Sequence, residues 1–306
     1  MSDGSILTVG EGLFELGLDD DGGPLREGFG GDAANTAVMA ARMGAPARLV
    51  GRVGDDTLGH RLLAFWRSCD VGVDDVVVDP SRPTGIYVNR RGVDGAHRFD
   101  YHRAGSAGSV IGPTDVEHVR TDGIAFVHFT GIGLAVSESS AQACAALAQR
   151  ARATGSRISF SANVRPRLAP DLDALRHAAA AADVVFLSVD DATLVYGSVE
   201  NAVAELSRTV AELVVTDGDR GATLHTGGDA IALHAPEVAF VDAAGAGDAV
   251  AGAYLAARAR GDEPAVALAQ GIVAGALSCR AFGCASSYPT SADVLVGCMA
   301  MGGVSI

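Results

Sequence analysis

The sequence contains no lysine, so all 23 of its basic residues are arginines. This absence excludes the phosphate-binding P-loop and the strand lysine of protein kinases, because each depends on a lysine ammonium group. Covalent catalysis through a lysine Schiff base is excluded for the same reason. Any anion that the protein binds must therefore be held by arginine side chains or by backbone N–H groups.

Other common patterns are also missing. The five cysteines form no Cys-x-x-Cys pair and fall mostly in apolar segments, which predicts buried free thiols in a reducing compartment. The eight histidines show no His-x-x-x-His spacing, so a zinc site is not expected. The net charge is −14 and no basic run occurs, which argues against a nucleic-acid partner.

Signals for export or membrane insertion are not found either. The N-terminal residues include neither a basic region nor a long apolar region, so no secretory signal is expected. The apolar run at residues 266–277 is interrupted by Gln270 and Gly271 and is too short to span a membrane. We therefore expect a cytoplasmic protein without a membrane partner.

Strand-like apolar runs alternate with helical runs over most of the chain. This alternation predicts a single α/β domain over residues 1–306, with a mostly parallel sheet covered by helices on both faces. The expected strands are residues 6–9, 47–50, 124–129, 157–160, 184–187 and 213–216. The expected helices are residues 32–43, 58–68, 137–153, 171–182 and 200–212, with two more after Asp248 and after Pro264.

Two segments depart from this alternation. Residues 75–101 contain short strands and turns with no helix between them, and residues 11–29 are polar and rich in glycine. We expect these parts to form a small β lid on the α/β body, with lid segments at about residues 11–30 and 75–103.

The segment from Asp242 to Ala249 is the most informative part of the sequence. Residues 238–241 are expected to form a strand and the residues after Asp248 a buried helix, with glycines at the junction. Glycines there let the N–H groups of the first helical turn meet an anion, and the helix dipole favours a carboxylate in its ionised form. Asp248 could then accept a proton beside a phosphate. The simpler interpretation is that Asp248 only caps the helix.

Polar residues follow three of the predicted strands directly. In parallel sheets ligands bind at the carboxyl ends of the strands, so these residues are expected to gather at one edge of the sheet. They are Asn163, Arg165 and Arg167; Ser188, Asp190 and Asp191; and Thr216, Gly218 and Gly221.

With these motifs the chain resembles the ribokinase-like, or PfkB, family of sugar kinases over nearly its whole length. The pattern Gly30-Gly31-x-x-x-Asn35, the run from Gly51 to Gly59, the loop from Thr216 to Gly221 and the segment from Asp242 to Asp248 are similar to that family's signatures. Three further segments resemble its 2-dehydro-3-deoxygluconokinases in particular: residues 84–87, 99–108 and 163–168.

The resemblance implies a three-layer ribokinase-like fold with a lid, and it implies roles for named residues. Asp248 would be the catalytic base. Gly245, Ala246 and Gly247 would form the turn of an anion hole, whose three donors would be the N–H groups of Ala246, Gly247 and Asp248. Gly31 and Asn35 would bind sugar hydroxyls, Tyr87 and Tyr101 would line the sugar from the lid, and Arg103 and Arg165 would approach a sugar carboxylate. An arginine fork suits a carboxylate, and a neutral sugar would not need one.

The resemblance also implies ATP and Mg²⁺ as cofactors, with a monovalent cation as a possible third. Asp191 would be an outer-sphere partner of the metal. Subunits of such kinases pair through their lids, which implies a homodimer. The residues implied at the nucleotide are Asn163, Arg165, Ser188, Thr216, Gly218, Gly221, Gly245 and Gly247.

Departures from the family pattern keep alternatives open. Ala243 stands where the family has threonine, Ser161 where these kinases usually have aspartate, and Ser188-x-x-Asp191 where the wider family has Asn-x-x-Glu. The alternatives are a kinase of a neutral sugar such as fructose or ribose, and a non-catalytic ligand-binding relative. A dinucleotide-binding oxidoreductase is a third, but the glycine after Gly245-x-Gly247 comes too late for it.

Overall fold

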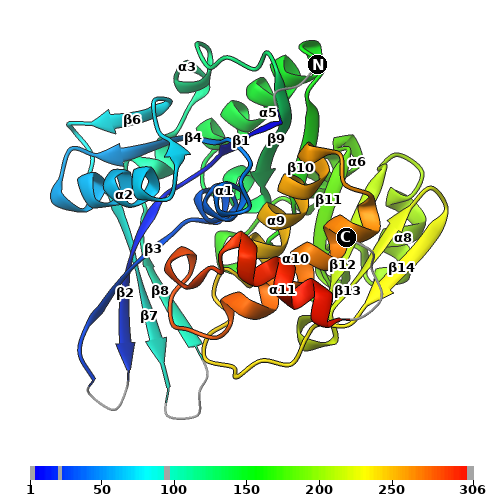
Figure 1. Ribbon diagram of the computed structural model, residues 1–306. Helices are drawn as coiled ribbons and strands as arrows, with labels where there is room; N and C mark the ends of the chain where they lie inside the picture. The colour runs from blue at the N-terminus through cyan, green and yellow to red at the C-terminus, as the bar shows by residue number, and fades with distance from the viewer. Residues whose placement is uncertain (1–3, 20–22, 93–96, 302–306) are drawn as a thin grey trace.

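The body of the protein is built around one large sheet. The computed structural model describes residues 4–19, 23–92 and 97–301. Its sheet has the order β14-β13-β12-β11-β10-β9-β1-β4-β5, and β6 pairs with β4 (Figure 1). Neighbouring strands from β5 to β12 in this order pair in parallel, and the pairings of β13 with β12 and with β14 are antiparallel. The strands are β1 Ser5–Val9, β4 Ala47–Gly54, β5 Val71–Gly72, β6 Val76–Asp79, β9 Ile124–Thr130, β10 Arg157–Ser161, β11 Val184–Ser188, β12 Glu212–Thr216, β13 Ala222–Thr226 and β14 Asp229–Leu233.

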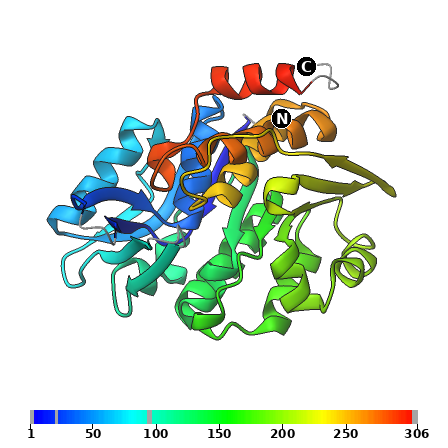
Figure 2. The same ribbon diagram turned by 90° about the horizontal axis from the view of Figure 1, so that it is seen from below.

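Helices cover both faces of this sheet, and each face has its own hydrophobic core. The C-terminal helices lie on one side and the helices from the middle of the chain on the other (Figure 2). This arrangement confirms the three-layer α/β fold that the alternation predicts. One face is packed by α1 Asp32–Arg42, α2 Thr57–Ser68, α9 Ala246–Arg260, α10 Pro264–Ser278 and α11 Ser291–Ala300. The other is packed by α3 Pro113–Val116, α4 Gly131–Ala135, α5 Glu138–Ala153, α6 Leu172–Ala181, α7 Val189–Tyr196 and α8 Val199–Leu206.

A second, four-stranded sheet projects from the body beside α2 (Figure 1). We call it the small sheet: β2 Leu13–Asp19, β3 Arg26–Gly30, β7 Gly85–Arg91 and β8 His97–His102, in the order β3-β2-β7-β8. Both segments predicted to form a lid contribute to it. The stretch from Val76 to Asp79 does not, because β6 pairs with β4 of the large sheet. The second lid segment therefore begins at Gly85 and not near residue 75.

Two other predictions of secondary structure were wrong, and one helix was missed. The helix expected over residues 200–212 ends at Leu206, and Glu212 begins β12. Glu212 is a buried acid whose carboxylate accepts hydrogen bonds from Tyr254 and Arg258, so its burial depends on partners far along the chain. Residues 238–241 form no strand. Helix α7, which starts directly after β11, was not expected.

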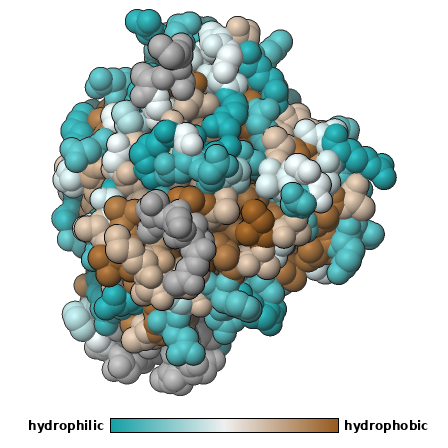
Figure 3. Space-filling view, turned by 45° about the vertical axis from the view of Figure 1, so that its right-hand side comes forward, coloured by the Kyte–Doolittle hydropathy of each residue, from teal (hydrophilic) through white to brown (hydrophobic). Residues whose placement is uncertain are grey.

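Among the described residues, no helix has the length and hydropathy needed to cross a membrane. Some large hydrophobic side chains are nevertheless exposed, among them Val296 and Met299 of α11 and Phe240 of the segment before α9. Hydrophobic residues cross the middle of the face seen in Figure 3.

Five cysteines are free, and Cys144, Cys284 and Cys298 are buried, as the sequence predicts.

Candidate active site

A cavity of about 600 Å³ lies where the small sheet meets the carboxyl ends of the parallel strands. It brings together nearly all the site residues predicted from the sequence. Gly218, Gly221 and Arg167 do not line it. Gly221 has a φ of 100°, and a Cβ there would lie 2.0 Å from the carbonyl oxygen of Leu233, so its role is to let β13 and β14 meet. The predicted residues that do line it are Gly31, Asn35, Tyr87, Tyr101, Arg103, Asn163, Arg165, Ser188, Asp190, Asp191, Thr216, Gly245, Ala246, Gly247 and Asp248.

The turn before α9 presents two backbone N–H groups to this cavity. Gly245 precedes the helix with a φ of 77°, which favours glycine, and its carbonyl oxygen accepts a hydrogen bond from the Tyr288 hydroxyl at 2.7 Å. The N–H of Ala246 donates to the carbonyl oxygen of Ala243 at 3.1 Å, so it is already used. The N–H groups of Gly247 and Asp248 have no acceptor among the described residues. The predicted anion hole therefore has two free donors, not three.

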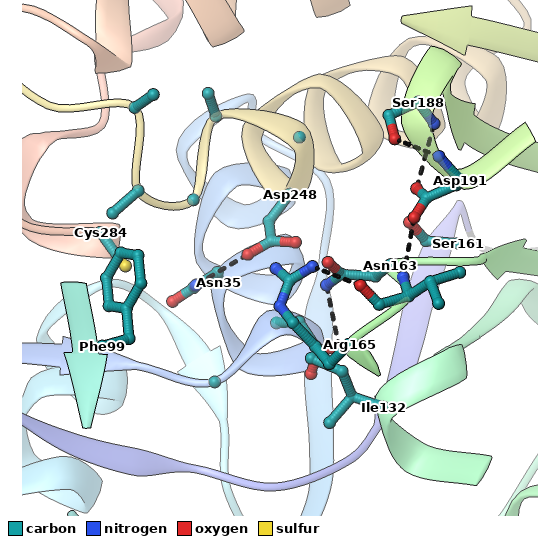
Figure 4. Close-up of a pocket in the computed structure, with 18 of the residues that line it drawn as sticks. Asn35, Phe99, Ile132, Ser161, Asn163, Arg165, Ser188, Asp191, Asp248 and Cys284 are labelled. Carbon is teal, nitrogen blue, oxygen red and sulfur yellow. Dashed lines mark hydrogen bonds between the residues drawn. The ribbon is translucent and has the colours of Figure 1, made fainter. Parts of the chain in front are cut away.

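The carboxylate of Asp248 does not cap the helix. Its Oδ2 accepts a hydrogen bond from the Asn35 side-chain amide at 2.8 Å, across the interface between α1 and α9 (Figure 4). The two helices approach closely at Gly252, where a Cβ would lie 2.6 Å from the carbonyl oxygen of Thr36. Asn35 thus holds the carboxylate toward the cavity, and the capping interpretation was wrong.

The charge of Asp248 also differs from the sequence-based expectation. Burial raises the pKa of its carboxyl group to about 7, and the nearby charge of Asp32 acts in the same direction. The hydrogen bond from Asn35 and the charge of Arg165 lower the pKa, but by less. The helix N-terminus therefore does not keep this group at its usual acidity. A carboxylate with a pKa near neutrality is a better proton acceptor than an ordinary aspartate.

The two predicted carboxylate-binding arginines have different surroundings. Arg103 is buried and donates from Nη1 to Glu11 Oε2 at 2.9 Å, and its guanidinium lies 4.7 Å from the ring centre of Tyr101. Arg165 is exposed, points toward Asp248, and has no acidic partner within ion-pair distance among the described residues (Figure 4). Its Nη1 donates to the carbonyl oxygen of Val164 at 3.1 Å, but no acid pairs with its charge, so Arg165 is available to an anionic ligand.

Sequence reasoning missed Glu11, which lines the cavity and is 4% exposed. Burial raises the pKa of its carboxyl group to about 7, although Arg103 and Ser106 act in the opposite direction. Asp32 was missed as well: it lines the cavity, and its Oδ2 accepts hydrogen bonds from Thr130 and Asn163. Single acids in a glycine-rich stretch and at a helix start carry no signal of these contacts.

We expect Arg103→Ala to lower the free energy of unfolding by about 3 kcal/mol at pH 8, because it leaves the buried Glu11 carboxylate without a partner. At pH 5.5 the loss should be smaller, since Glu11 is then protonated and carries no charge. Urea unfolding at both pH values measures the difference. The double variant Arg103→Ala/Glu11→Gln is the control and should recover most of the loss at pH 8. A loss that is the same at both pH values would contradict the assignment.

Aromatic side chains of the small sheet form one wall of the cavity. The rings of Tyr87 and Tyr101 are stacked, with centroids 5.7 Å apart, and Phe99 lies on the same face of β8 as Tyr101. The Tyr87 hydroxyl lies 3.2 Å from Cys284 Sγ. Phe99 and Cys284 were not predicted. The i, i+2 spacing of Phe99 and Tyr101 is the signal that could have identified Phe99.

Ser188 and Asp191 hold the other half of the cavity in place. The Ser188 hydroxyl accepts from the N–H of Asp191 at 2.9 Å, and Asp191 Oδ2 accepts from the N–H of Ser188 at 3.1 Å. This capping box starts α7 directly at the end of β11. The other oxygen of Asp191 accepts from the N–H of Val164 at 2.9 Å. Both oxygens of Asp191 are therefore engaged by the backbone, and the described residues contain no cluster of three His, Cys, Asp or Glu side chains that could hold a metal ion.

A buried chain of polar groups joins the turn before α9 to the small sheet. Asp242 Oδ1 accepts from the N–H of Ala244 at 2.9 Å, and its Oδ2 accepts from the N–H of Gly283 at 3.1 Å. The Asn89 amide lies between the carboxylates of Asp242 and Glu15, at 3.4 Å and 2.8 Å. The turn is thus fixed without a hydroxyl at Ala243, and it is tied to β2 and β7.

Comparison with known proteins gives consistent results. Residues 6–291 match a family described as "pfkB family carbohydrate kinase". The chain is 37% identical to a 2-dehydro-3-deoxygluconokinase from Thermoproteus tenax, over 89% of this chain and 87% of that protein. It is 32% identical to a fructokinase from Klebsiella pneumoniae, over 95% of this chain and 98% of that protein.

Solved structures show the same fold. A putative ribokinase II from E. coli, in complex with ATP and Mg²⁺, superposes with a TM-score of 0.88 at 22% identity, over 97% of this chain and 99% of that chain. The likeness extends over both the large and the small sheet. It concerns the fold, since identity at this level does not carry residue roles.

Proposed function

Because the chain belongs to the pfkB family of carbohydrate kinases, we propose that it transfers the γ-phosphoryl group of ATP to a hydroxyl of a sugar acid. The preferred acceptor in this proposal is 2-dehydro-3-deoxy-D-gluconate, which would be converted to its 6-phosphate. The observation that carries it is the place of Arg165, a cation without an acidic partner among the described residues, beside Asp248 in the cavity. The Thermoproteus tenax relative supports the same acceptor.

The proposed chemistry starts at Asp248. Its carboxylate accepts the proton of the acceptor hydroxyl as that oxygen attacks the γ-phosphorus and the bond to ADP breaks. The free N–H groups of Gly247 and Asp248 bind the phosphoryl oxygens, with the positive end of α9 behind them. Asn35 keeps the carboxylate aimed at the hydroxyl. Positioning and charge stabilisation matter more here than basicity, because the transition state is loose.

Magnesium would act as the partner of ATP and neutralise charge on the β- and γ-phosphates. Asp191 fits an outer-sphere role only, since both of its oxygens already accept backbone hydrogen bonds. Mg²⁺ commonly keeps several of its waters and uses substrate phosphates as ligands, so a dedicated protein cluster is not required. The putative ribokinase II of the same fold was solved with ATP and Mg²⁺, which is compatible with this role.

The nucleotide would occupy the half of the cavity between α7 and the segment before α9. Leu194 and Phe240 line this half and are 50% and 62% exposed, so an adenine ring could cover both apolar side chains. Asn163, Ser188 and Thr216 line the same cavity. The small sheet would act as a lid: Tyr87 and Tyr101 cover the sugar and exclude water, which limits hydrolysis of ATP.

A kinase of a neutral sugar is the second candidate. The Klebsiella pneumoniae fructokinase matches over more of this chain than the Thermoproteus tenax protein does, although at lower identity. The ion pair of Arg103 with Glu11 also favours it, because a neutralised arginine has less to offer to a carboxylate.

A panel of acceptors, with ADP release as the measurement, tests the proposal. We expect 2-dehydro-3-deoxygluconate to have a kcat/KM at least about a hundredfold above those of fructose and ribose, since loss of a charged hydrogen-bond partner costs about 3 kcal/mol. A higher kcat/KM for fructose would replace the proposal by the second candidate. If none of the acceptors in the panel causes ADP release, the kinase assignment itself is contradicted.

A further inference from the structure

A second cavity, of about 820 Å³, lies outside the active-site cavity, between the edge strand β8 and the short helical turn Pro166–Leu168. Its lining is strongly basic. One acid, Asp100, and five arginines are among the residues that form it: Arg90, Arg98, Arg103, Arg165 and Arg167. We call it the basic cavity. The chain as a whole has 37 acidic and 23 basic residues, so this local excess of arginine runs against the overall charge.

The arrangement of these arginines is costly for the fold. Arg90 and Arg98 lie directly opposite each other on β7 and β8. Like charges in that position destabilise a sheet. Asp100 Oδ2 lies 3.6 Å from Arg90 Nε, and both side chains are about half exposed. This ion pair therefore offsets little of the repulsion between the two arginines. The side chain of Arg98 is exposed and forms no ion pair or hydrogen bond with another described residue.

The basic cavity adjoins the active-site cavity. Both are lined by Phe99, Tyr101, Arg103, Arg165 and Pro166. Arg167 donates from Nη1 to the carbonyl oxygen of Phe99 at 3.0 Å, which ties the turn to the edge of β8 where the two cavities meet. Tyr101 is 38% exposed there. Because successive side chains of a strand alternate between its faces, Arg90 and Arg98 lie on the face of the small sheet opposite to Tyr101. A ligand therefore moves from these two arginines to Asp248 around the edge strand β8, past Tyr101 and the shared arginines.

An acidic protein repels an anionic acceptor at a distance, and a local cluster of one charge sign can reverse that effect. We propose that the basic cavity is a capture site for the carboxylate of the acceptor, in which Arg98 and Arg90 hold an anionic sugar acid before it moves past Tyr101 to Arg165. This inference rests on the proposed function, because a neutral sugar would gain nothing from these charges.

The test uses Arg98→Ser and Arg98→Glu, which remove one and two units of charge from the basic cavity. At an ionic strength of about 20 mM we expect kcat/KM for the sugar acid to fall about threefold and about tenfold. At about 500 mM both variants should come within about twofold of the wild-type enzyme, since salt screens charges at this range. Neither kcat nor the KM for ATP should change.

Arg208→Ser and Arg208→Glu are the matched controls. Arg208 is exposed in the turn between α8 and β12, at the opposite end of the parallel strands. Its two substitutions change the net charge by the same amounts as those of Arg98. The controls should leave kcat/KM for the sugar acid unchanged. The capture site would be overturned by any of three results: a loss of kcat/KM that is the same at low and high salt, the same loss in the Arg98 and Arg208 variants, or a loss confined to kcat.

The outcome separates this inference from the proposed function. If the wild-type enzyme prefers a neutral sugar, the proposed function and the capture site both fail. If it prefers the sugar acid but the Arg98 variants behave like the Arg208 variants, only the capture site fails.

Discussion

Asp248→Asn is expected to lower kcat by about a thousandfold, because the amide cannot accept the proton of the acceptor hydroxyl. The substitution keeps the shape of the side chain and a group that can accept the hydrogen bond from Asn35. The N–H groups of Gly247 and Asp248 are untouched, so the dissociation constants of ATP and sugar should change by less than about threefold. Pre-steady-state phosphoryl transfer and equilibrium binding, measured on the same preparation, separate the two effects.

Two further readouts make this prediction specific. The kcat of the wild-type enzyme should fall as the pH drops through the raised pKa of Asp248, in a range where an ordinary aspartate stays ionised, and the residual activity of the variant should lack this step. The variant should also be at least as stable as the wild type at pH 8. For an acid with a raised folded pKa, stability declines as the pH rises from the unfolded to the folded pKa, and asparagine removes that decline. A kcat near normal, or an unfolded variant, would contradict the assignment.

Arg165→Ala is expected to lower kcat/KM for the sugar acid by about thirtyfold, and that for a neutral sugar by less than threefold, since a charged hydrogen bond contributes about 2 kcal/mol. Arg165 is a cleaner probe than Arg103. Its side chain is exposed and has no acidic partner among the described residues, so its removal leaves no buried charge behind. Arg103→Ala would instead expose the unpaired Glu11 to the cavity and mix stability with specificity.

The pH of this measurement matters. Arg165 lowers the pKa of Asp248, so its loss shifts that pKa further upward and reduces activity on every acceptor at neutral pH. Rates should therefore be compared at about pH 8.5, where Asp248 is ionised in both proteins. Arg208→Ala serves as the control for loss of one positive charge. Equal losses of kcat/KM for the sugar acid and for the neutral sugar would show that Arg165 does not recognise the carboxylate.

The sequence was sufficient to predict the three-layer fold, the family and the cavity residues on both sides of Asp248, because glycine turns and polar strand ends are local patterns. The same pattern can carry two meanings, however. Ser188-x-x-Asp191 was interpreted as a site for metal and nucleotide, and helix α7 was missed although the same residues form its capping box. A capping box and a ligand site use the same side chains, and only the backbone geometry separates them.

Long-range electrostatics could not be predicted at all. The expectation for Asp248 considered the helix that follows it, which favours the charged form. The structure adds burial and Asp32, which together outweigh it. Glu11 was missed for a similar reason: its partner Arg103 is 92 residues away in the sequence. Burial and distant charge depend on the complete fold, so no local spacing reveals them.

The hydrogen bond between Asn35 and Asp248 joins residues that are 213 positions apart. At a translation rate of about 10 residues per second, the ribosome adds Asp248 about 20 s after Asn35. During that interval α9, which belongs to the same hydrophobic core as α1, has not been synthesised. The nascent chain therefore exposes the face of α1 that α9 will cover. A growing chain can thus form the α1 side of the cavity well before the carboxylate that Asn35 binds has been synthesised.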